Sequence, residues 1–230
     1  MTLEALIFAG IGSLAECADL DRAAWNASFR SHGVDWSWSW DTYCELMRPG
    51  GDRQLAASYA AHMGELVQAE MLDSTHQKHF ATMLAGGVPL RPGVARVMKW
   101  AARGGIKLAF VSRSQTDPVR ALLVATARER GGQSFDVAVL RGDVSRLAPA
   151  PDGMISAVTQ LGVGVGRTVV VADTPVAAEA AQAAGLPVLA FPGRLAEAEP
   201  EAFGAIPMTH ALSPEALAVA WRGAQSHAAE

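Results

Sequence analysis

Three short apolar runs in this chain end at residues whose backbone or side-chain groups could form a ligand site. The candidates at and just after these ends are a turn glycine, two hydroxyls, a guanidinium and a carboxylate: Gly12, Ser13, Ser112, Arg113 and Asp173. Backbone N–H groups, hydroxyls and guanidinium groups are the donors with which proteins hold phosphate. We therefore expect a phosphate or ligand site wherever the fold brings the three ends together.

The first of these ends lacks the side chain that a hydrolytic site would need. The apolar run Leu3–Phe8 leads into Ala9, and the turn Gly10–Ser13 follows. Alanine has no lone pair with which to attack a substrate, and the Ser13 hydroxyl has no evident base to activate it. The stretch therefore has the plan of an active-site turn without an obvious nucleophile.

Apolar runs with helical segments between them indicate the elements that position these residues. Strands are predicted at Leu3–Phe8, Leu108–Val111, Phe135–Leu140, Thr168–Ala172 and Val188–Phe191. Strands that alternate with helices through short connections predict an α/β fold with a doubly wound parallel sheet. Functional residues in such a sheet lie at the carboxyl ends of the strands.

The long stretch between the first and second predicted strands shows helical spacing and no strand pattern of its own. It is most simply an inserted domain. We predict an α/β core domain of residues 1–15 and 85–230, and an all-helical cap domain of residues 16–84.

Aromatic and histidine side chains are prominent in the predicted cap. Trp36, Trp38 and Trp40 alternate with serines, and we expect them to fill a small helical core, with a ligand pocket as the alternative. His76 and His79 lie one helical turn apart, but a metal site needs more ligands than two. We expect both histidines to be solvated.

Composition excludes several classes of protein. The net charge of −4 and the absence of a basic block argue against nucleic-acid binding. No apolar run has the length of a membrane span, and no secretory signal is evident, so a cytoplasmic location without a membrane partner is expected. Cys17 and Cys44 have no metal-like spacing and are expected to be free thiols.

Several motifs, taken in chain order, resemble the haloacid dehalogenase superfamily. ALIFAGIGSLAE stands in place of its hydrophobic-Asp-x-Asp-Gly-Thr-Leu motif, LRPGV in place of its return from cap to core, and APAPD in place of its Lys-Pro-x-Pro-Asp stretch. VVVADTPVAAEAAQAAGL resembles its fourth motif. In the cap, WNASFRSHGVDWSW and GGDRQ resemble the sugar-bisphosphate phosphatases, although Asp52 replaces a frequent lysine. The resemblance implies a Rossmannoid core with a helical cap, as in the β-phosphoglucomutase-like subgroup.

In that family one Asp attacks phosphorus, a second Asp transfers the proton, a Lys holds phosphoryl oxygens and Mg²⁺ offsets charge repulsion. The resemblance places these three side-chain roles at Ala9, Ile11 and Ala148, and it places Ala172 beside the retained Asp173. It therefore implies a member whose nucleophile, acid/base and lysine positions are replaced. Mg²⁺ is expected for the family, but most of its ligands are lost here, so no cofactor is predicted.

The favoured hypothesis is a non-catalytic binding or regulatory homologue of a sugar-phosphate phosphatase, with a small phosphorylated ligand or an active paralogue as partner. One alternative is an active phosphohydrolase in which Asp143 or Asp19 converges on Asp173. Another is a dinucleotide-binding protein, because Gly10-Ile11-Gly12 begins a G-x-G-x-x-A fingerprint. That fingerprint also requires a following strand that ends in an acidic residue, and none is predicted near Asp35.

Overall fold

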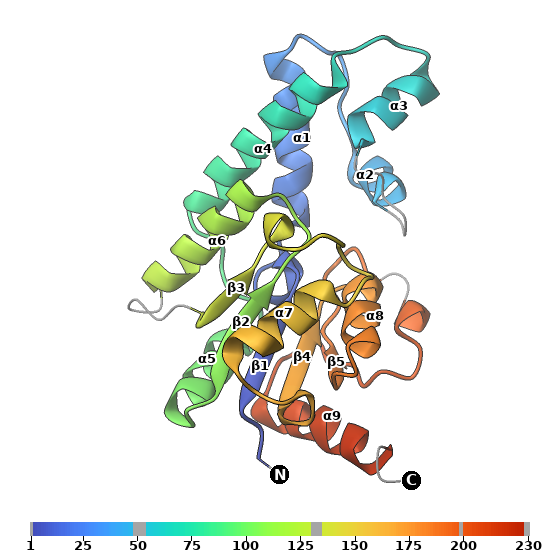
Figure 1. The fold of residues 1–230 in the computed structure, drawn as a ribbon. Helices are drawn as coiled ribbons and strands as arrows, with labels where there is room; N and C mark the ends of the chain where they lie inside the picture. Colours follow the sequence, from blue (N-terminus) through green and yellow to red (C-terminus); the bar gives the residue numbers. More distant parts are fainter. Residues whose placement is uncertain (1, 48–53, 130–134, 198–199, 228–230) are drawn as a thin grey trace.

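The computed structural model describes residues 2–47, 54–129, 135–197 and 200–227 (Figure 1). Asp52, the residue in place of a cap lysine, lies outside the described residues. In the described parts of the chain, no helix has both the length and the apolar character needed to cross a membrane.

In the described residues, a five-stranded parallel sheet has the order β3-β2-β1-β4-β5. The strands are β1 Ala5–Ala9, β2 Lys107–Val111, β3 Val137–Val139, β4 Thr168–Ala172 and β5 Val188–Ala190. The predicted doubly wound α/β fold is confirmed, and β4 has the predicted bounds. The central strand β1 is buried along its whole length, and its last residue, Ala9, pairs with Val111 and with Ala172.

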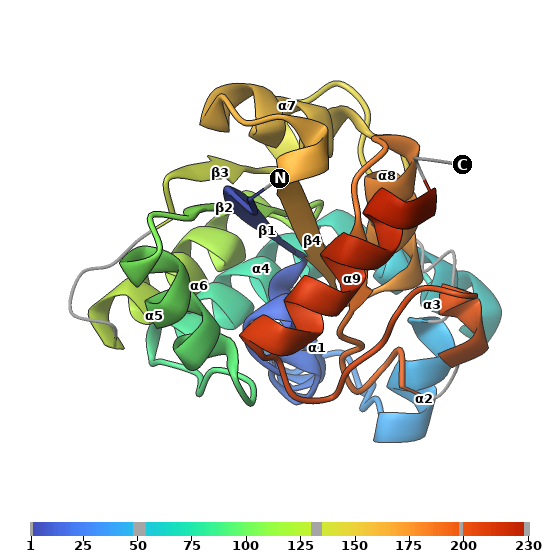
Figure 2. The ribbon, with the colours of Figure 1, turned by 90° about the horizontal axis from the view of Figure 1, so that it is seen from below.

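Helices cover both faces of this sheet (Figure 2). They are α5 Val94–Arg103, α6 Thr116–Glu129, α7 Asp152–Leu161, α8 Pro175–Ala183 and α9 Pro214–His227. Side chains alternate between the faces of a strand. Leu6 and Phe8 of β1 therefore pack with α5, α6 and α9, whereas Ala5, Ile7 and Ala9 pack with α7 and α8.

Four helices lie above the carboxyl ends of the strands: α1 Ala18–Ser31, α2 Trp40–Leu46, α3 Leu55–Met63 and α4 Ala69–Ala85 (Figure 1). The described residues of the predicted cap contain no strand. Phe80 and Leu84 at the end of α4 pack with the sheet's own core. The division at residues 15/16 and 84/85 therefore stays a prediction, because α4 belongs to both cores.

The core of the four upper helices is aromatic. Its main members are Trp25, Phe29, Trp36, Trp38 and Tyr43. The prediction that tryptophans fill this core is confirmed for Trp36 and Trp38, which are buried and do not line the cavity described below. Trp40 is half-buried and carries the Arg194 guanidinium 3.7 Å above its ring.

The expectation that His76 is solvated is wrong. Its ring is buried, stacks on Trp25 with ring centroids 4.0 Å apart, and places Nε2 2.9 Å from Asp21 Oδ1. Asp21 Oδ2 also accepts the Tyr43 hydroxyl proton at 2.6 Å. His79 is half-buried, and its Nε2 lies 3.1 Å from Ser31 Oγ. The Asp21 carboxylate therefore ties α1 to α2 and α4.

Candidate functional site

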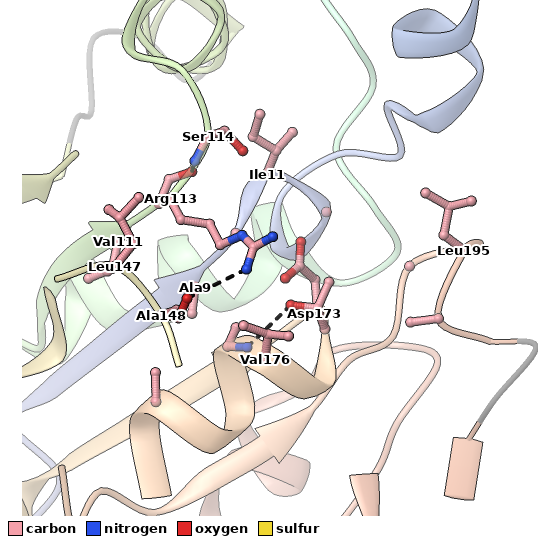
Figure 3. Close-up of a pocket in the computed structure, with 18 of the residues that line it drawn as sticks. Ala9, Ile11, Val111, Arg113, Ser114, Leu147, Ala148, Asp173, Val176 and Leu195 are labelled. Carbon is pink, nitrogen blue, oxygen red and sulfur yellow. Dashed lines mark hydrogen bonds between the residues drawn. The ribbon is translucent and has the colours of Figure 1, made fainter. Parts of the chain in front are cut away.

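A cavity of about 390 Å³ lies between the strand ends and the upper helices (Figure 3). Parallel strands place their carboxyl ends at one edge of a sheet, and the cavity occupies that edge. The predicted site residues that line it are Ala9, Ile11, Gly12, Ser112, Arg113, Ala148 and Asp173. The fold therefore gathers residues that are up to about 160 positions apart in the sequence.

Ser13 was expected to contribute to a ligand site, and the structure contradicts this. It lies in the short 3-10 helix Ile11–Ser13, is fully buried and does not line the cavity. Its hydroxyl donates to the Gly10 carbonyl at 2.7 Å. The tight turn directs the side chain back onto its own backbone, so Ser13 stabilises the turn instead of facing a ligand.

The turn after β1 is shaped around the Asp173 carboxylate. Gly10 has a φ of 91°, which glycine adopts without steric cost. A Cβ on Gly10 would lie 2.1 Å from Asp173 Oδ1, and a Cβ on Gly12 would lie 2.7 Å from Oδ2. The Gly12 N–H donates to the same carboxylate. The two glycines thus leave room for a buried acid beside the turn.

Burial dominates the electrostatics of this acid. It raises the pKa of Asp173 from 3.8 to about 6, although the Gly12 N–H, the Arg91 guanidinium and the Thr174 hydroxyl oppose the shift. The residue is 7% exposed. Thr174 also caps the next helix, because its Oγ1 accepts a hydrogen bond from the Ala177 N–H at 3.3 Å. Asp173 is therefore easier to protonate than an ordinary aspartate.

This pKa predicts a specific dependence of stability on pH. The folded-state pKa of Asp173 lies above its unfolded value. Its contribution to the free energy of unfolding is therefore fully present below about pH 4 and is lost as the pH rises through about 6. Asparagine cannot ionise. The unfolding free energy of Asp173→Asn relative to the parent protein should therefore rise by about 3 kcal/mol between about pH 4 and pH 8. Urea denaturation across this range measures the difference, and a constant difference would contradict the prediction.

A buried arginine holds the turn from below. Arg91 is 9% exposed and donates to three carbonyls: Gly12 O at 2.6 Å, Phe191 O at 2.8 Å and Pro192 O at 2.6 Å. Its guanidinium carbon also lies 3.6 Å from the centre of the Phe191 ring. Arg91 was missed from sequence. The signal that could have found it is a lone cation between the apolar residues Leu90 and Pro92.

Ser112 and Arg113 follow β2 and face the cavity from the other side. The Ser112 side chain is nearly buried, and its Oγ accepts the Ser114 N–H at 3.1 Å. Arg113 is exposed to the cavity and extends over the strand ends between Ala148 and Asp173 (Figure 3). Its Nη1 lies 3.5 Å from the Ala148 carbonyl oxygen. The guanidinium therefore reaches the segment where the family lysine would stand.

The alternative of a rearranged active site required Asp143 or Asp19 to converge on Asp173. The structure places both carboxylates away from the cavity, so this expectation is wrong. Asp143 accepts the Leu140 N–H at 2.8 Å, and Asp19 pairs with Arg194 and with Arg22. Neither Asp143 nor Asp19 is among the described residues that line the cavity. Within the described residues, no group of three or more His, Cys, Asp or Glu side chains could hold a metal ion.

Two other acids do line the cavity, but both are engaged. Asp21 holds Tyr43 and His76, as described above. Glu16 accepts the Ala18 N–H at 3.3 Å with Oε1 and the Arg194 N–H at 2.8 Å with Oε2. These bonds fix the acids in the connection between core and upper helices.

Cys17 and Cys44 are not joined in a disulfide, as predicted. Burial raises the pKa of Cys17 to about 12, and the nearby charges of Glu16, Asp21 and Asp173 add to the shift. A thiol with this pKa remains protonated at neutral pH, and only the thiolate is a strong nucleophile. Cys17 therefore does not replace the missing nucleophile.

The structure also argues against a dinucleotide site at Gly10-Ile11-Gly12. After α1 the described chain continues through the tryptophan segment into α2, and the next strand along the sequence is β2. The Gly12 N–H is already used by Asp173. The strand that should carry the acidic ribose ligand is thus absent from residues 16–47 and 54–84.

Comparison with known proteins agrees with this architecture. A family model described as haloacid dehalogenase-like hydrolase matches residues 15–185. The chain belongs to this family, which confirms the resemblance seen in the motifs. Among named relatives, Protein CbbY of Rhodobacter capsulatus is 32% identical over 196 residues, which cover 84% of this chain and 86% of the relative.

Comparison with solved structures identifies relatives with the same fold. CbbY from Rhodobacter sphaeroides in complex with phosphate has a TM-score of 0.80 and 29% identity, covering 94% of this chain and 100% of that chain. A CbbY variant in complex with xylulose-(1,5)bisphosphate has a TM-score of 0.80 and 30% identity, covering 94% of this chain and 99% of that chain. β-Phosphoglucomutase from Clostridium difficile, at 14% identity and a TM-score of 0.72, shares the fold and covers 98% of this chain and 100% of its own.

Proposed function

We propose that this chain is a non-catalytic member of the haloacid dehalogenase-like hydrolases, and that it binds a small phosphorylated ligand between the core and the upper helices. The observation that carries the proposal is which side chains stand at the carboxyl ends of the strands. Ala9 offers a methyl group where the family has its nucleophile, and Asp173, the retained acid, is buried against Gly10 and Gly12. Among the described residues at this edge, no carboxylate takes the place of the missing nucleophile at Ala9.

The family uses Mg²⁺, and the donor set at this edge does not fit it. Magnesium binds carboxylate and carbonyl oxygens in octahedral geometry. Ala9 and Ala172 supply no side-chain oxygen, and Asp173 is hydrogen-bonded to the turn. Ile11 supplies no acid/base group either. We therefore derive no metal-dependent step for this protein and propose no cofactor.

Binding of a phosphorylated ligand is supported by the cavity and by the relatives. CbbY has been solved with phosphate and with xylulose-(1,5)bisphosphate, and its fold matches this chain over 94% of its length. Here the Arg113 guanidinium faces the cavity, with Ser112 beside it. A partnership with an active paralogue and a cytoplasmic location stay predictions.

The proposal predicts binding without turnover. Hydrolysis of p-nitrophenyl phosphate with Mg²⁺ should equal the protein-free rate, because the nucleophile and acid/base side chains are each worth at least a hundredfold in rate and both are missing. Asp173→Ala should leave that rate unchanged. Inorganic phosphate should still give a calorimetric binding signal. Magnesium-dependent hydrolysis that Asp173→Ala abolishes would contradict the proposal.

A further inference from the structure

The walls of the cavity are apolar over most of the space that a ligand would occupy (Figure 3). Side chains that face it from the strand ends, the loop before α7, the start of α8 and the loop after β5 include Ile11, Val111, Leu147, Ala148, Val176 and Leu195. A cavity of about 390 Å³ is within the size range of small-molecule sites. Such walls favour an apolar body over a sugar, whose hydroxyls would lose their hydrogen bonds to water.

The positive charge in the cavity is limited. Among the described residues, three arginines line it, and two have acidic partners. Arg146 Nη2 lies 3.0 Å from Asp152 Oδ2, and Arg194 pairs with Asp19. No described carboxylate forms an ion pair with Arg113. One guanidinium is therefore available to meet one anionic group.

The negative charge in the same cavity restricts what else can bind. Glu16 and Asp21 line the side that leads to the upper helices, and Asp173 lies at the strand ends. A second phosphate on the ligand would meet these carboxylates or the apolar walls. Like charges placed together cost binding energy. The charge pattern therefore disfavours a bisphosphate.

Resting on the proposed function, we infer that the ligand carries a single phosphate held by Arg113 and an apolar body that fills the cavity, as in a phosphate monoester of an apolar alcohol. Arg113 takes over the role of the missing lysine, because its guanidinium reaches the Ala148 segment from the β2 side. Arginine suits this role, since its planar donors match phosphate oxygens in pairs.

Calorimetric titration with three probes tests the ligand class: inorganic phosphate, hexyl phosphate and hexane-1,6-diyl bisphosphate. Each buried methylene should tighten binding about fourfold, so hexyl phosphate should bind at least about tenfold more tightly than inorganic phosphate. The bisphosphate, which has the same carbon chain, should bind no more tightly than hexyl phosphate. Equal affinity for inorganic and hexyl phosphate, or a tenfold preference for the bisphosphate, would overturn the inference and leave the proposed function standing.

Two substitutions distinguish the contribution of the phosphate from that of the apolar body to binding. Arg113→Gln should weaken inorganic phosphate and hexyl phosphate alike by at least about tenfold. Leu147→Asn should weaken hexyl phosphate but leave inorganic phosphate unchanged. Arg120→Gln is the matched control, because Arg120 is an exposed arginine on α6 that does not line the cavity. If no probe binds the parent protein at all, the proposed function fails together with the inference, whereas loss of the chain-length effect alone overturns only the inference.

Discussion

Replacing Gly10 with alanine is expected to lower the free energy of unfolding by about 4 kcal/mol. Two effects contribute. The φ of 91° is strained for any residue with a Cβ, and the new methyl would lie 2.1 Å from Asp173 Oδ1. The buried carboxylate would have to leave its place beside the turn, so the Gly12 N–H would lose its acceptor. Urea denaturation measures the change.

A matched glycine separates conformational strain from the clash. Gly162 has a φ of 65°, but a Cβ there would meet nothing within 4 Å. Gly162→Ala should therefore cost only about 1 kcal/mol. The double variant Gly10→Ala with Asp173→Ala should recover part of the loss, because the clashing oxygens are gone. If Gly10→Ala costs no more than Gly162→Ala, the carboxylate does not occupy the turn.

Replacing Arg91 with alanine is expected to cost about 4 kcal/mol, because the buried carbonyls of Gly12, Phe191 and Pro192 would lose a charged donor. Arg91→Lys should recover only part of this loss, since an ammonium cannot present the planar fork of donors that spans three carbonyls. Denaturation midpoints in urea compare the variants.

The control for Arg91 is an arginine whose ion pair is exposed. The Arg146 side chain is 72% exposed and pairs with Asp152, so Arg146→Ala should cost no more than about 1 kcal/mol. Similar losses for the two alanine variants would show that Arg91 does not hold the turn and the loop after β5 together.

The fold was largely predictable because its signals are local. The β-branched residues Thr168–Val171 lie within the strand Thr168–Ala172, and the helical period of Val94–Arg103 lies within one helix. The bounds of both elements were predicted correctly. Burial of β1 on both faces follows from its continuous apolar run. Shorter elements were less well bounded, since β3 covers Val137–Val139 and not Phe135–Leu140.

The site was less predictable because its interactions join residues far apart in sequence. The burial of His76 depends on Asp21, and the position of Arg91 depends on carbonyls about 80 and 100 residues away. The direction of the Ser13 hydroxyl depends on the 3-10 geometry of its turn. The predicted strand ends correctly placed Ala9, Ser112, Arg113 and Asp173 at one edge of the sheet. The sequence did not predict which backbone N–H groups would donate hydrogen bonds to Asp173.

The phosphorus-31 NMR spectrum of hexyl phosphate, recorded for hours with an equal amount of protein and Mg²⁺, tests the central claim most directly. It observes binding and hydrolysis in one sample. Binding without chemistry predicts a shifted or broadened ester resonance and no more inorganic phosphate than in the protein-free sample. A resonance of inorganic phosphate that grows with time, requires Mg²⁺ and is absent with Asp173→Ala would contradict it, as would an ester resonance that the protein leaves unchanged.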